Sequence, residues 1–156
     1  MSSFPRETAV NDPTIKLHDS EPLFENCAEI LSALAADGVI LAVATGKGRR
    51  GLDLTLQQHG LSDHFTVLKT ADDGPGKPHP AILEDAMREV GADPQQTVMI
   101  GDTVFDMQLA VNAKTHAVGV SWGYHDPHEL KTTGATAVAD HFNELPDILN
   151  RLWSKG

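Results

Sequence analysis

Two carboxylates follow a short apolar run in the second half of the chain. The run at residues 97–100 leads into Gly101, and Asp102 and Asp106 come directly after it. Hard cations such as Mg²⁺ prefer oxygen ligands and keep several waters, so one or two carboxylates at a strand end can hold one beside a phosphate. We predict that Asp102 and Asp106 bind Mg²⁺, with Mn²⁺ or another divalent cation as alternatives. For Asp102 a second interpretation is an N-terminal cap of the following helix.

Two further segments carry groups that bind phosphate. The apolar run at residues 39–44 ends in Thr45-Gly46-Lys47-Gly48, and the segment Gly76-Lys77-Pro78-His79-Pro80 lies between the two runs. A hydroxyl beside backbone N–H groups binds phosphate oxygens, and a lysine neutralises their charge. The predicted substrate-binding residues are therefore Thr45, Gly46, Lys47 and Lys77, and the predicted catalytic residues are Asp102, Lys77 and Thr45.

Strands and helices alternate along the sequence. Apolar runs predict strands over residues 39–44, 65–69, 97–100, 117–120 and 135–140. Helical spacing and stop signals predict helices over residues 25–37, 49–59, 80–90, 105–113, 129–133 and 145–153. This alternation predicts an α/β fold with a mostly parallel sheet, in which ligands bind outside the carboxyl ends of the strands. Thr45 and Asp102 both fall at such ends.

The order of these motifs resembles a known family. A strand ending in Thr45, a loop containing Lys77 and a strand followed by Asp102 and Asp106 are similar to motifs two, three and four of the haloacid dehalogenase (HAD) superfamily, particularly its phosphoglycolate-phosphatase-like branch. The resemblance runs from about Glu21 to Leu149. It implies a three-layer, Rossmann-like core and the hydrolysis of phosphoric esters.

One motif of that superfamily is absent from this sequence. Its members begin with a strand ending in Asp-x-Asp-Gly-Thr, whose first Asp is the nucleophile and whose second is the general acid and base; no such string occurs here. The segment Phe4–Val10 resembles a remnant of the helical cap. We therefore expect residues 1–20 to be a cap remnant or a replacement segment and residues 21–156 to be a truncated core, with the first, central strand missing or replaced.

A missing central strand would leave two rows of unpaired N–H and C=O groups facing a gap. Three outcomes are open: the gap closes, another chain fills it, or the segment Thr14–His18 inserts. The second outcome predicts a homodimer that pairs across the gap. The third would put Asp19 and Glu21 at the Asp-x-Asp spacing, as a surrogate nucleophile and acid.

The resulting functional hypothesis is a metal-dependent phosphoric-ester hydrolase of phosphatase or phosphodiesterase type. It would work without the usual Asp nucleophile, and a metal-bound water is the natural substitute because coordination lowers its pKa toward neutrality. The alternative is a catalytically incomplete HAD-like domain that binds phosphate or metal or assembles with another chain.

Acidic and histidine groups elsewhere leave smaller alternatives open. His125 and His128 flank Asp126, as in a transition-metal site, although the resembled phosphatases carry a similar loop near the active site. Asp72 and Asp73 could approach the cation, but a solvated turn is the simpler interpretation.

Composition limits the partners. The 156 residues include 12 basic and 22 acidic side chains, which gives a formal net charge of −10 and disfavours nucleic acid and anionic membranes. One cysteine and the lack of an apolar run near eighteen residues lead us to expect a cytoplasmic protein. The resemblance to the superfamily implies a small phosphorylated substrate.

Overall fold

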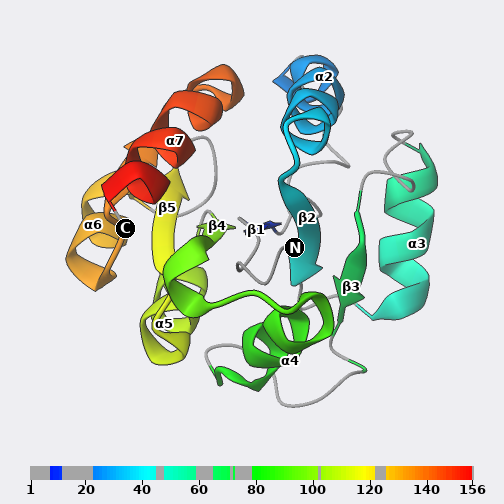
Figure 1. Cartoon of the computed structure of the whole chain (residues 1–156), viewed down its shortest axis with the longest axis horizontal. Helices are drawn as coiled ribbons and strands as arrows, with labels where there is room; N and C mark the ends of the chain where they lie inside the picture. The colour runs from blue at the N-terminus through cyan, green and yellow to red at the C-terminus, as the bar shows by residue number, and fades with distance from the viewer. Residues whose placement is uncertain are drawn as a thin grey trace, which may run out of the picture.

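The chain forms a parallel sheet covered by helices on both faces (Figure 1). The computed structural model describes residues 8–11, 23–44, 48–58, 65–70, 72, 79–101, 103–121 and 126–155. Six strands lie in the order β3-β2-β1-β4-β5-β6, and every neighbouring pair is parallel. The predicted three-layer α/β architecture with a mostly parallel sheet is therefore confirmed.

The bounds of the elements agree with the predicted alternation to within a few residues at most ends. The strands are β1 Thr8–Asn11, β2 Ile40–Ala44, β3 Val67–Lys69, β4 Thr97–Gly101, β5 His116–Val120 and β6 Ala137–Ala139. The helices are α2 Leu23–Ala36, α3 Arg49–Gln58, α4 Ala81–Val90, α5 Val104–Ala113, α6 Pro127–Thr133 and α7 Leu145–Lys155. Two short 3₁₀ helices, η3 Pro94–Gln96 and η4 Phe142–Glu144, precede β4 and α7.

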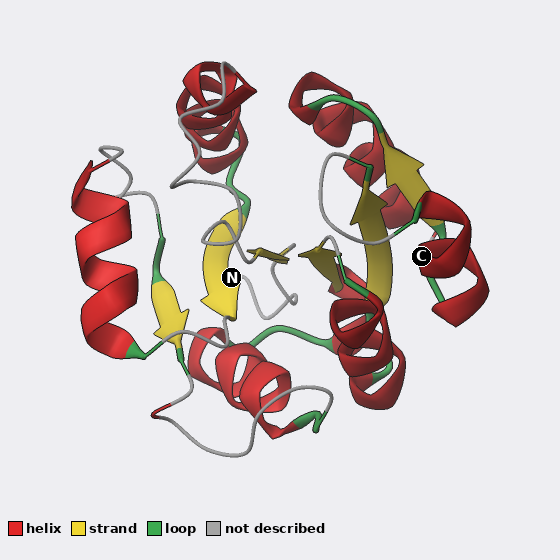
Figure 2. Ribbon diagram, turned by 180° about the vertical axis from the view of Figure 1, so that it is seen from behind, coloured by secondary structure: helices red, strands yellow, loops and turns green. Residues whose placement is uncertain are grey.

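The helices divide into two groups, one on each face of the sheet (Figure 2). Successive side chains of a strand point to opposite faces. Accordingly Leu41 and Val43 of β2 pack in one core cluster with residues of α2, α3 and α7. Ala42 and Ala44 pack in the other cluster with residues of α4, α5 and α6.

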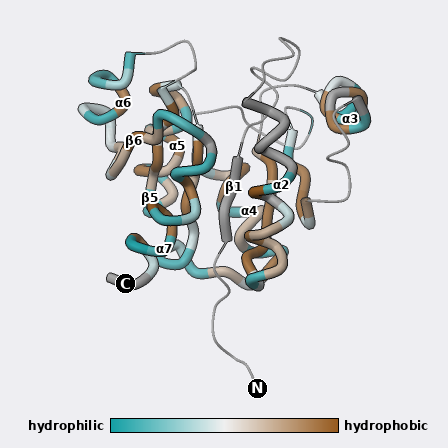
Figure 3. The backbone as a smooth tube through the Cα atoms, turned by 90° about the horizontal axis from the view of Figure 1, so that it is seen from above, coloured by the Kyte–Doolittle hydropathy of each residue, from teal (hydrophilic) through white to brown (hydrophobic). Residues whose placement is uncertain are grey.

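Burial on both faces explains the composition of these strands. All five residues of β4 are buried, as are Leu41 to Ala44 of β2, and the strands labelled β5 and β6 are coloured mainly as hydrophobic in Figure 3. Parallel strands covered by helices on both sides read as continuous apolar runs because neither face meets water. The runs at residues 39–44 and 97–100 were identifiable as strands for this reason.

The centre of the sheet corrects one expectation from the sequence. Strand β1 lies between β2 and β4, where Ala9 is in register with Leu41 on one side and with Val98 on the other. Residues 8–10 belong to the segment that we interpreted as a cap remnant, and that interpretation is wrong for these residues. They form part of the central strand, which pairs the polar backbone groups of both neighbours.

Two further hypotheses about the gap lose their basis. The segment Thr14–His18, which we considered for insertion, lies outside the described residues, and the central position is already occupied by β1. The surrogate role of Asp19 and Glu21 depended on that insertion. A homodimer that pairs across the gap is likewise no longer required, since one chain supplies all six strands.

None of the helices in the described part of the chain is both long enough and apolar enough to span a bilayer.

Candidate functional site

The carboxyl ends of the three central strands meet around Asn11. Asn11, the last residue of β1, is in register with Val43 of β2 and with Ile100 of β4. Thr45 follows two residues after Val43 in the sequence, and Asp102 follows two residues after Ile100. The strands are parallel, so all three ends lie at one edge of the sheet, where α/β folds bind their ligands.

The predicted substrate-binding and catalytic residues themselves lie outside the described residues. These residues are Thr45, Gly46, Lys47, Lys77 and Asp102. The described elements on either side of them are well defined: Ala44 ends β2, Gly48 precedes α3, and Gly101 and Thr103 flank Asp102. The structure therefore brings together the strand ends from which Thr45 and Asp102 continue.

Asp106 is the predicted site residue that the structure describes, and it is fully buried at the start of α5. Thr103 is the N-cap of this helix, and its Oγ1 accepts a hydrogen bond from the backbone N–H of Asp106 at 3.2 Å. In return Oδ2 of Asp106 accepts bonds from the backbone N–H of Thr103 at 3.4 Å and from the Thr103 hydroxyl at 3.0 Å. This reciprocal arrangement is a capping box, which satisfies N–H groups that a helix start leaves without intrahelical partners.

The capping box excludes one of the two interpretations of Asp102. Because Thr103 is the N-cap of α5, the interpretation of Asp102 as the cap of this helix is wrong. The sequence signal for the true cap was present as Thr103-x-x-Asp106, a close variant of the capping-box pattern.

Gly101 is required by the close approach of Asp106 to the end of β4. A Cβ atom added to Gly101 would overlap the side chain of Asp106, including its carboxylate. The absence of a side chain at position 101 thus creates the space in which a carboxylate lies against the strand end. Gly101 and Thr103, the described residues on either side of Asp102 in the sequence, therefore both lie against Asp106.

The start of α3 is held by a residue from a different part of the chain. The backbone N–H of Arg49 donates to Oδ2 of Asp72 at 2.8 Å, and Nη2 of Arg49 donates to the carbonyl oxygen of Leu68 at 2.8 Å. The backbone N–H of Asp72 donates in turn to Oγ1 of Thr70 at 3.2 Å. Our interpretation of Asp72 as a solvated turn residue missed this function, because the two partners are 23 residues apart.

The loop that contains Lys77 is followed by a second local anchor. Nδ1 of His79 accepts the backbone N–H of Ala81, the first residue of α4, at 3.1 Å. The first N–H groups of a helix have no intrahelical acceptor, and Nδ1 of His79 accepts one of them. His79 thus helps to fix the start of α4, shortly after Lys77 in the sequence.

The candidate histidine cluster has a structural explanation in its described part. Asp126 is the N-cap of α6 and accepts the backbone N–H of His128 at 2.7 Å, while His125 lies outside the described residues. Within the described ranges, no three His, Cys, Asp or Glu side chains gather as a metal cluster would require.

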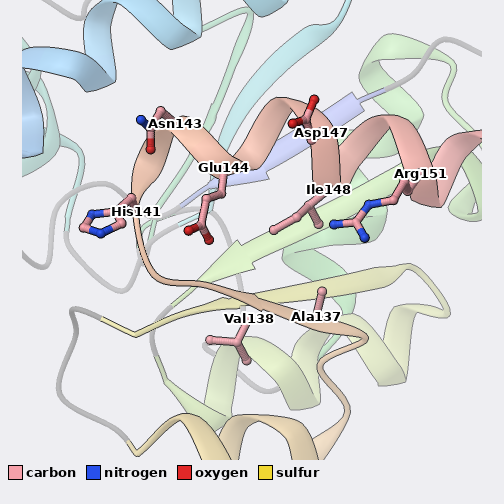
Figure 4. A pocket seen from close by; sticks show the side chains of 8 residues that line it. All are labelled: Ala137, Val138, His141, Asn143, Glu144, Asp147, Ile148 and Arg151. Carbon is pink, nitrogen blue, oxygen red and sulfur yellow. The ribbon is translucent and has the colours of Figure 1, made fainter.

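A surface cavity of about 490 Å³ lies elsewhere, between β6 and α7. Its lining, shown in Figure 4, consists of Ala137, Val138, His141, Asn143, Glu144, Asp147, Ile148 and Arg151. None of these residues belongs to the predicted site. Strand β6 is at the edge of the sheet, separated from β1 by β4 and β5.

Comparison with known proteins tests the resemblance of the motifs. A family model described as haloacid dehalogenase-like hydrolase matches residues 6–120, about three quarters of the chain. This chain belongs to that family. The match begins upstream of β1 and ends with β5, so it includes all three central strand ends of the HAD-like core.

Curated relatives of this HAD-like chain include named phosphatases. The chain is 36% identical over 124 residues to a Dickeya dadantii protein named "Probable phosphatase IndB", covering 79% of this chain and 54% of the relative. It is 31% identical over 133 residues to a phosphoglycolate phosphatase of Vibrio vulnificus, covering 85% of this chain and 58% of the relative. The chain thus spans somewhat more than half the length of these relatives.

A solved structure gives the same comparison in three dimensions. A HAD family hydrolase from Deinococcus radiodurans R1, with bound phosphate and sodium, is similar with a TM-score of 0.76 and 29% sequence identity. The similarity covers 82% of this HAD-like chain and 59% of the other. The observed core is therefore a HAD-like core.

Proposed function

We propose that this protein is a metal-dependent phosphoric-ester hydrolase of HAD-like fold. The observation that carries the proposal is the meeting of the ends of β2, β1 and β4 at one edge of the sheet, from which Thr45 and Asp102 continue. The membership of the chain in the haloacid dehalogenase-like hydrolase family supports it, as do relatives that are named as phosphatases.

Phosphate recognition is assigned to the loops after β2 and before α4. The Thr45 hydroxyl and the N–H groups of Gly46 and Lys47 would donate to phosphate oxygens, and Lys77 would neutralise charge that develops on the phosphoryl group. The similar hydrolase of Deinococcus radiodurans has a bound phosphate, which supports phosphate as a ligand of this fold. Lys47 and Lys77 matter particularly because the chain as a whole carries a net charge of −10 and would otherwise repel a phosphate dianion.

The acidic turn fits a hard divalent cation. Asp102 and Asp106 supply carboxylate oxygens, the ligand type that Mg²⁺ prefers, and the space left by Gly101 holds the Asp106 carboxylate against the end of β4. Because Oδ2 of Asp106 already accepts two bonds from Thr103, we assign Asp102 as the principal ligand and Asp106 as the residue that also fixes the turn. Bound there, Mg²⁺ or Mn²⁺ would act as a Lewis acid toward the phosphate and lower the pKa of a water.

The attacking group is the part of the mechanism that departs from the superfamily. The central strand ends in Asn11, and a neutral amide does not replace a carboxylate nucleophile. The residue that follows it in the sequence is Asp12. We propose that water attacks the phosphorus atom while the ester P–O bond breaks, and that a proton returns to the leaving oxygen, so that no phosphoaspartyl group forms.

The substrate class is a small phosphorylated molecule, by analogy with the phosphoglycolate phosphatase relative. A core without a large cap would enclose such a molecule poorly, so phosphodiesters and activated esters are included in the proposal. The single cysteine supports a cytoplasmic location. A homodimer across the sheet is not part of the proposal, since β1 occupies that position.

The deciding experiment measures hydrolysis of p-nitrophenyl phosphate and bis-p-nitrophenyl phosphate, with and without Mg²⁺ or Mn²⁺. We expect the wild type to be active only with a metal, and Asp102→Asn to lose at least about a hundredfold in kcat/KM, as for the loss of a key electrostatic group. Activity that survives unchanged in Asp102→Asn would rule out the metal site and indicate a contaminating enzyme.

Asp12→Asn separates the two kinds of nucleophile. Retained activity in this variant supports attack by water, because the carboxylate nearest to the end of β1 has then been removed without effect. Complete loss of activity would instead assign the attack to Asp12. The stereochemistry at phosphorus is a second readout, since direct attack by water inverts it, whereas two successive displacements through a phosphoaspartyl group retain it.

One observation favours a second candidate function. The sequence lacks Asp-x-Asp-Gly-Thr, and its central strand ends in Asn11 instead of Asp. A catalytically incomplete domain that binds phosphate and metal would show calorimetric binding of inorganic phosphate and Mg²⁺, abolished by Asp102→Asn, and no turnover of either ester.

A further inference from the structure

A network of three hydrogen bonds connects the start of α3 to the chain after β3. The Arg49 guanidinium donates to the carbonyl oxygen of Leu68, and the backbone N–H of Arg49 donates to Oδ2 of Asp72. The backbone N–H of Asp72 donates to Oγ1 of Thr70. Thr70 is fully buried, so its side chain holds this end of the network in place. We name these four residues, Arg49, Leu68, Thr70 and Asp72, the α3 bracket.

The bracket lies between two loops that are separated in the sequence. Arg49 is the first residue of α3 and comes two residues after Lys47, so its backbone position fixes one end of the loop that contains Thr45 and Gly46. Asp72 comes five residues before Lys77, so its position fixes one end of the other loop. The bond between Arg49 N and Asp72 Oδ2 therefore joins the two segments that contribute groups to the proposed phosphate site.

Two further features fit this function. A carboxylate at a helix N-terminus is stabilised by the helix dipole and accepts an N–H group that has no intrahelical partner. The carboxylate also lies directly beside the residue before α3, since a Cβ atom added at Gly48 would make an ordinary contact with Asp72 Oδ2 at 3.4 Å.

We propose that Asp72 is a positioning residue, which sets the distance between the Thr45–Lys47 loop and the Lys77 loop by capping α3 from outside the helix. It acts through Arg49 and not through contact with substrate. The inference rests on the proposed function for its kinetic consequence, whereas the coupling of the two loops can be measured independently of any activity.

The carboxylate is expected to act by its hydrogen bond and not by its charge. Asp72→Asn keeps an acceptor oxygen and removes the negative charge, so this variant should retain KM within about twofold or lower it, because repulsion of the phosphate dianion is reduced. Asp72→Ala removes the acceptor. It should raise KM for p-nitrophenyl phosphate about fivefold to tenfold and change kcat less than twofold. The expected change in KM is the usual free-energy contribution of an N-cap, expressed as a ratio of equilibrium constants.

Glu144→Ala is the matched control. Glu144 also presents an exposed acceptor to a backbone N–H, that of Asp140 at 2.9 Å, but it lies beyond β6 at the edge of the sheet opposite to β3. Both alanine variants remove one bond of the same kind, so they should lower Tm to a similar extent. Only Asp72→Ala should raise KM, which separates positioning from a general loss of stability.

Hydrogen exchange followed by mass spectrometry tests the coupling without turnover. In Asp72→Ala, peptides that cover residues 45–48 and residues 73–78 should both exchange faster than in the wild type, and neither should change in Glu144→Ala. Faster exchange in only one of the two peptides, or equal KM values for the two alanine variants of an active enzyme, would overturn the positioning function. If the wild type is inactive but both peptides exchange faster in Asp72→Ala, the proposed function is contradicted and the coupling of the two segments by the α3 bracket is supported.

Discussion

The hydroxyl of Thr103 donates a hydrogen bond to Oδ2 of Asp106 at 3.0 Å and accepts one from the Asp106 N–H at 3.2 Å. The second carboxylate of the acidic turn is therefore held by the residue that caps its own helix. Asp106 is fully buried, so loss of the Thr103 hydroxyl removes one hydrogen bond from a buried carboxylate. This relationship makes the stability of α5 and the geometry of the proposed metal turn depend on the same three bonds.

Thr103→Val tests that dependence. Valine has nearly the shape of threonine but no hydroxyl, so the variant should lose about 1–2 kcal/mol of unfolding free energy, the cost of a lost N-cap. Urea denaturation followed by circular dichroism measures the loss. Thr103→Ser keeps the hydroxyl and should lie within about 0.5 kcal/mol of the wild type. A loss in Thr103→Ser with none in Thr103→Val would show that the methyl group, and not the capping box, stabilises the turn.

Gly101→Ala tests the close approach of Asp106 to β4. The added Cβ atom would overlap the Asp106 side chain, and overpacking of this kind typically costs about 1–3 kcal/mol. The same denaturation experiment should show this loss, together with a reduced stabilisation by Mg²⁺ in thermal melts. Gly48→Ala is the control for stability, because its Cβ would make an ordinary contact at 3.4 Å. A stable Gly101→Ala variant would mean that Asp106 relocates without cost.

Ala9→Pro tests the central strand. Ala9 has neighbours on both sides, Leu41 and Val98, so its N–H faces a paired strand whichever side it points to. Proline removes this N–H and leaves an acceptor on the neighbour unpaired, at a cost of about 1–3 kcal/mol or more. Ala137→Pro is the control, since β6 is an edge strand with β5 as its one neighbour. If Ala9→Pro melts at the wild-type temperature while Ala137→Pro does not, β1 is not the central strand in solution.

The occupied centre of the sheet also predicts the oligomeric state. With β1 between β2 and β4, no second chain is needed to pair these strands, and we expect the molar mass of a single chain. Size-exclusion chromatography with multi-angle light scattering over a hundredfold range of protein concentration measures it. A dimer that Ala9→Pro leaves intact would point to pairing at the edge strands. A dimer that dissociates when Ala9 is replaced by proline would indicate that two chains pair across the centre of the sheet.

The sequence predicted the elements whose signal is local. Val43 and Met99 lie in continuous apolar runs because both faces of their strands are buried, and such runs are visible without knowledge of the partners. Strand β1 has no such signal: Thr-Ala-Val-Asn is short, and only its pairing with strands far along the chain makes it a strand. Tertiary context decides such segments.

The contacts around the candidate site divide in the same way, into those with a local signal and those without one. The capping pattern of Thr103 and Asp106 is readable within four residues, although we assigned the cap to Asp102 as one alternative. The bond from Arg49 to Asp72 spans 23 residues and leaves no periodic or compositional trace. Interactions between loops, which set the geometry of a phosphate site, therefore had to come from the structure.

The position of β1 has a consequence for how the polypeptide reaches its folded state. Thr8 is translated before either of its partners, and it must wait for Ile40 and then for Thr97 before its second row of backbone groups is paired. Contacts over such long stretches of chain slow folding, because the entropy of closing the loop is lost before the strands are joined. During synthesis the nascent chain thus carries an unfinished sheet edge until β4 has left the ribosome, and in that interval it is most exposed to aggregation and to binding by chaperones.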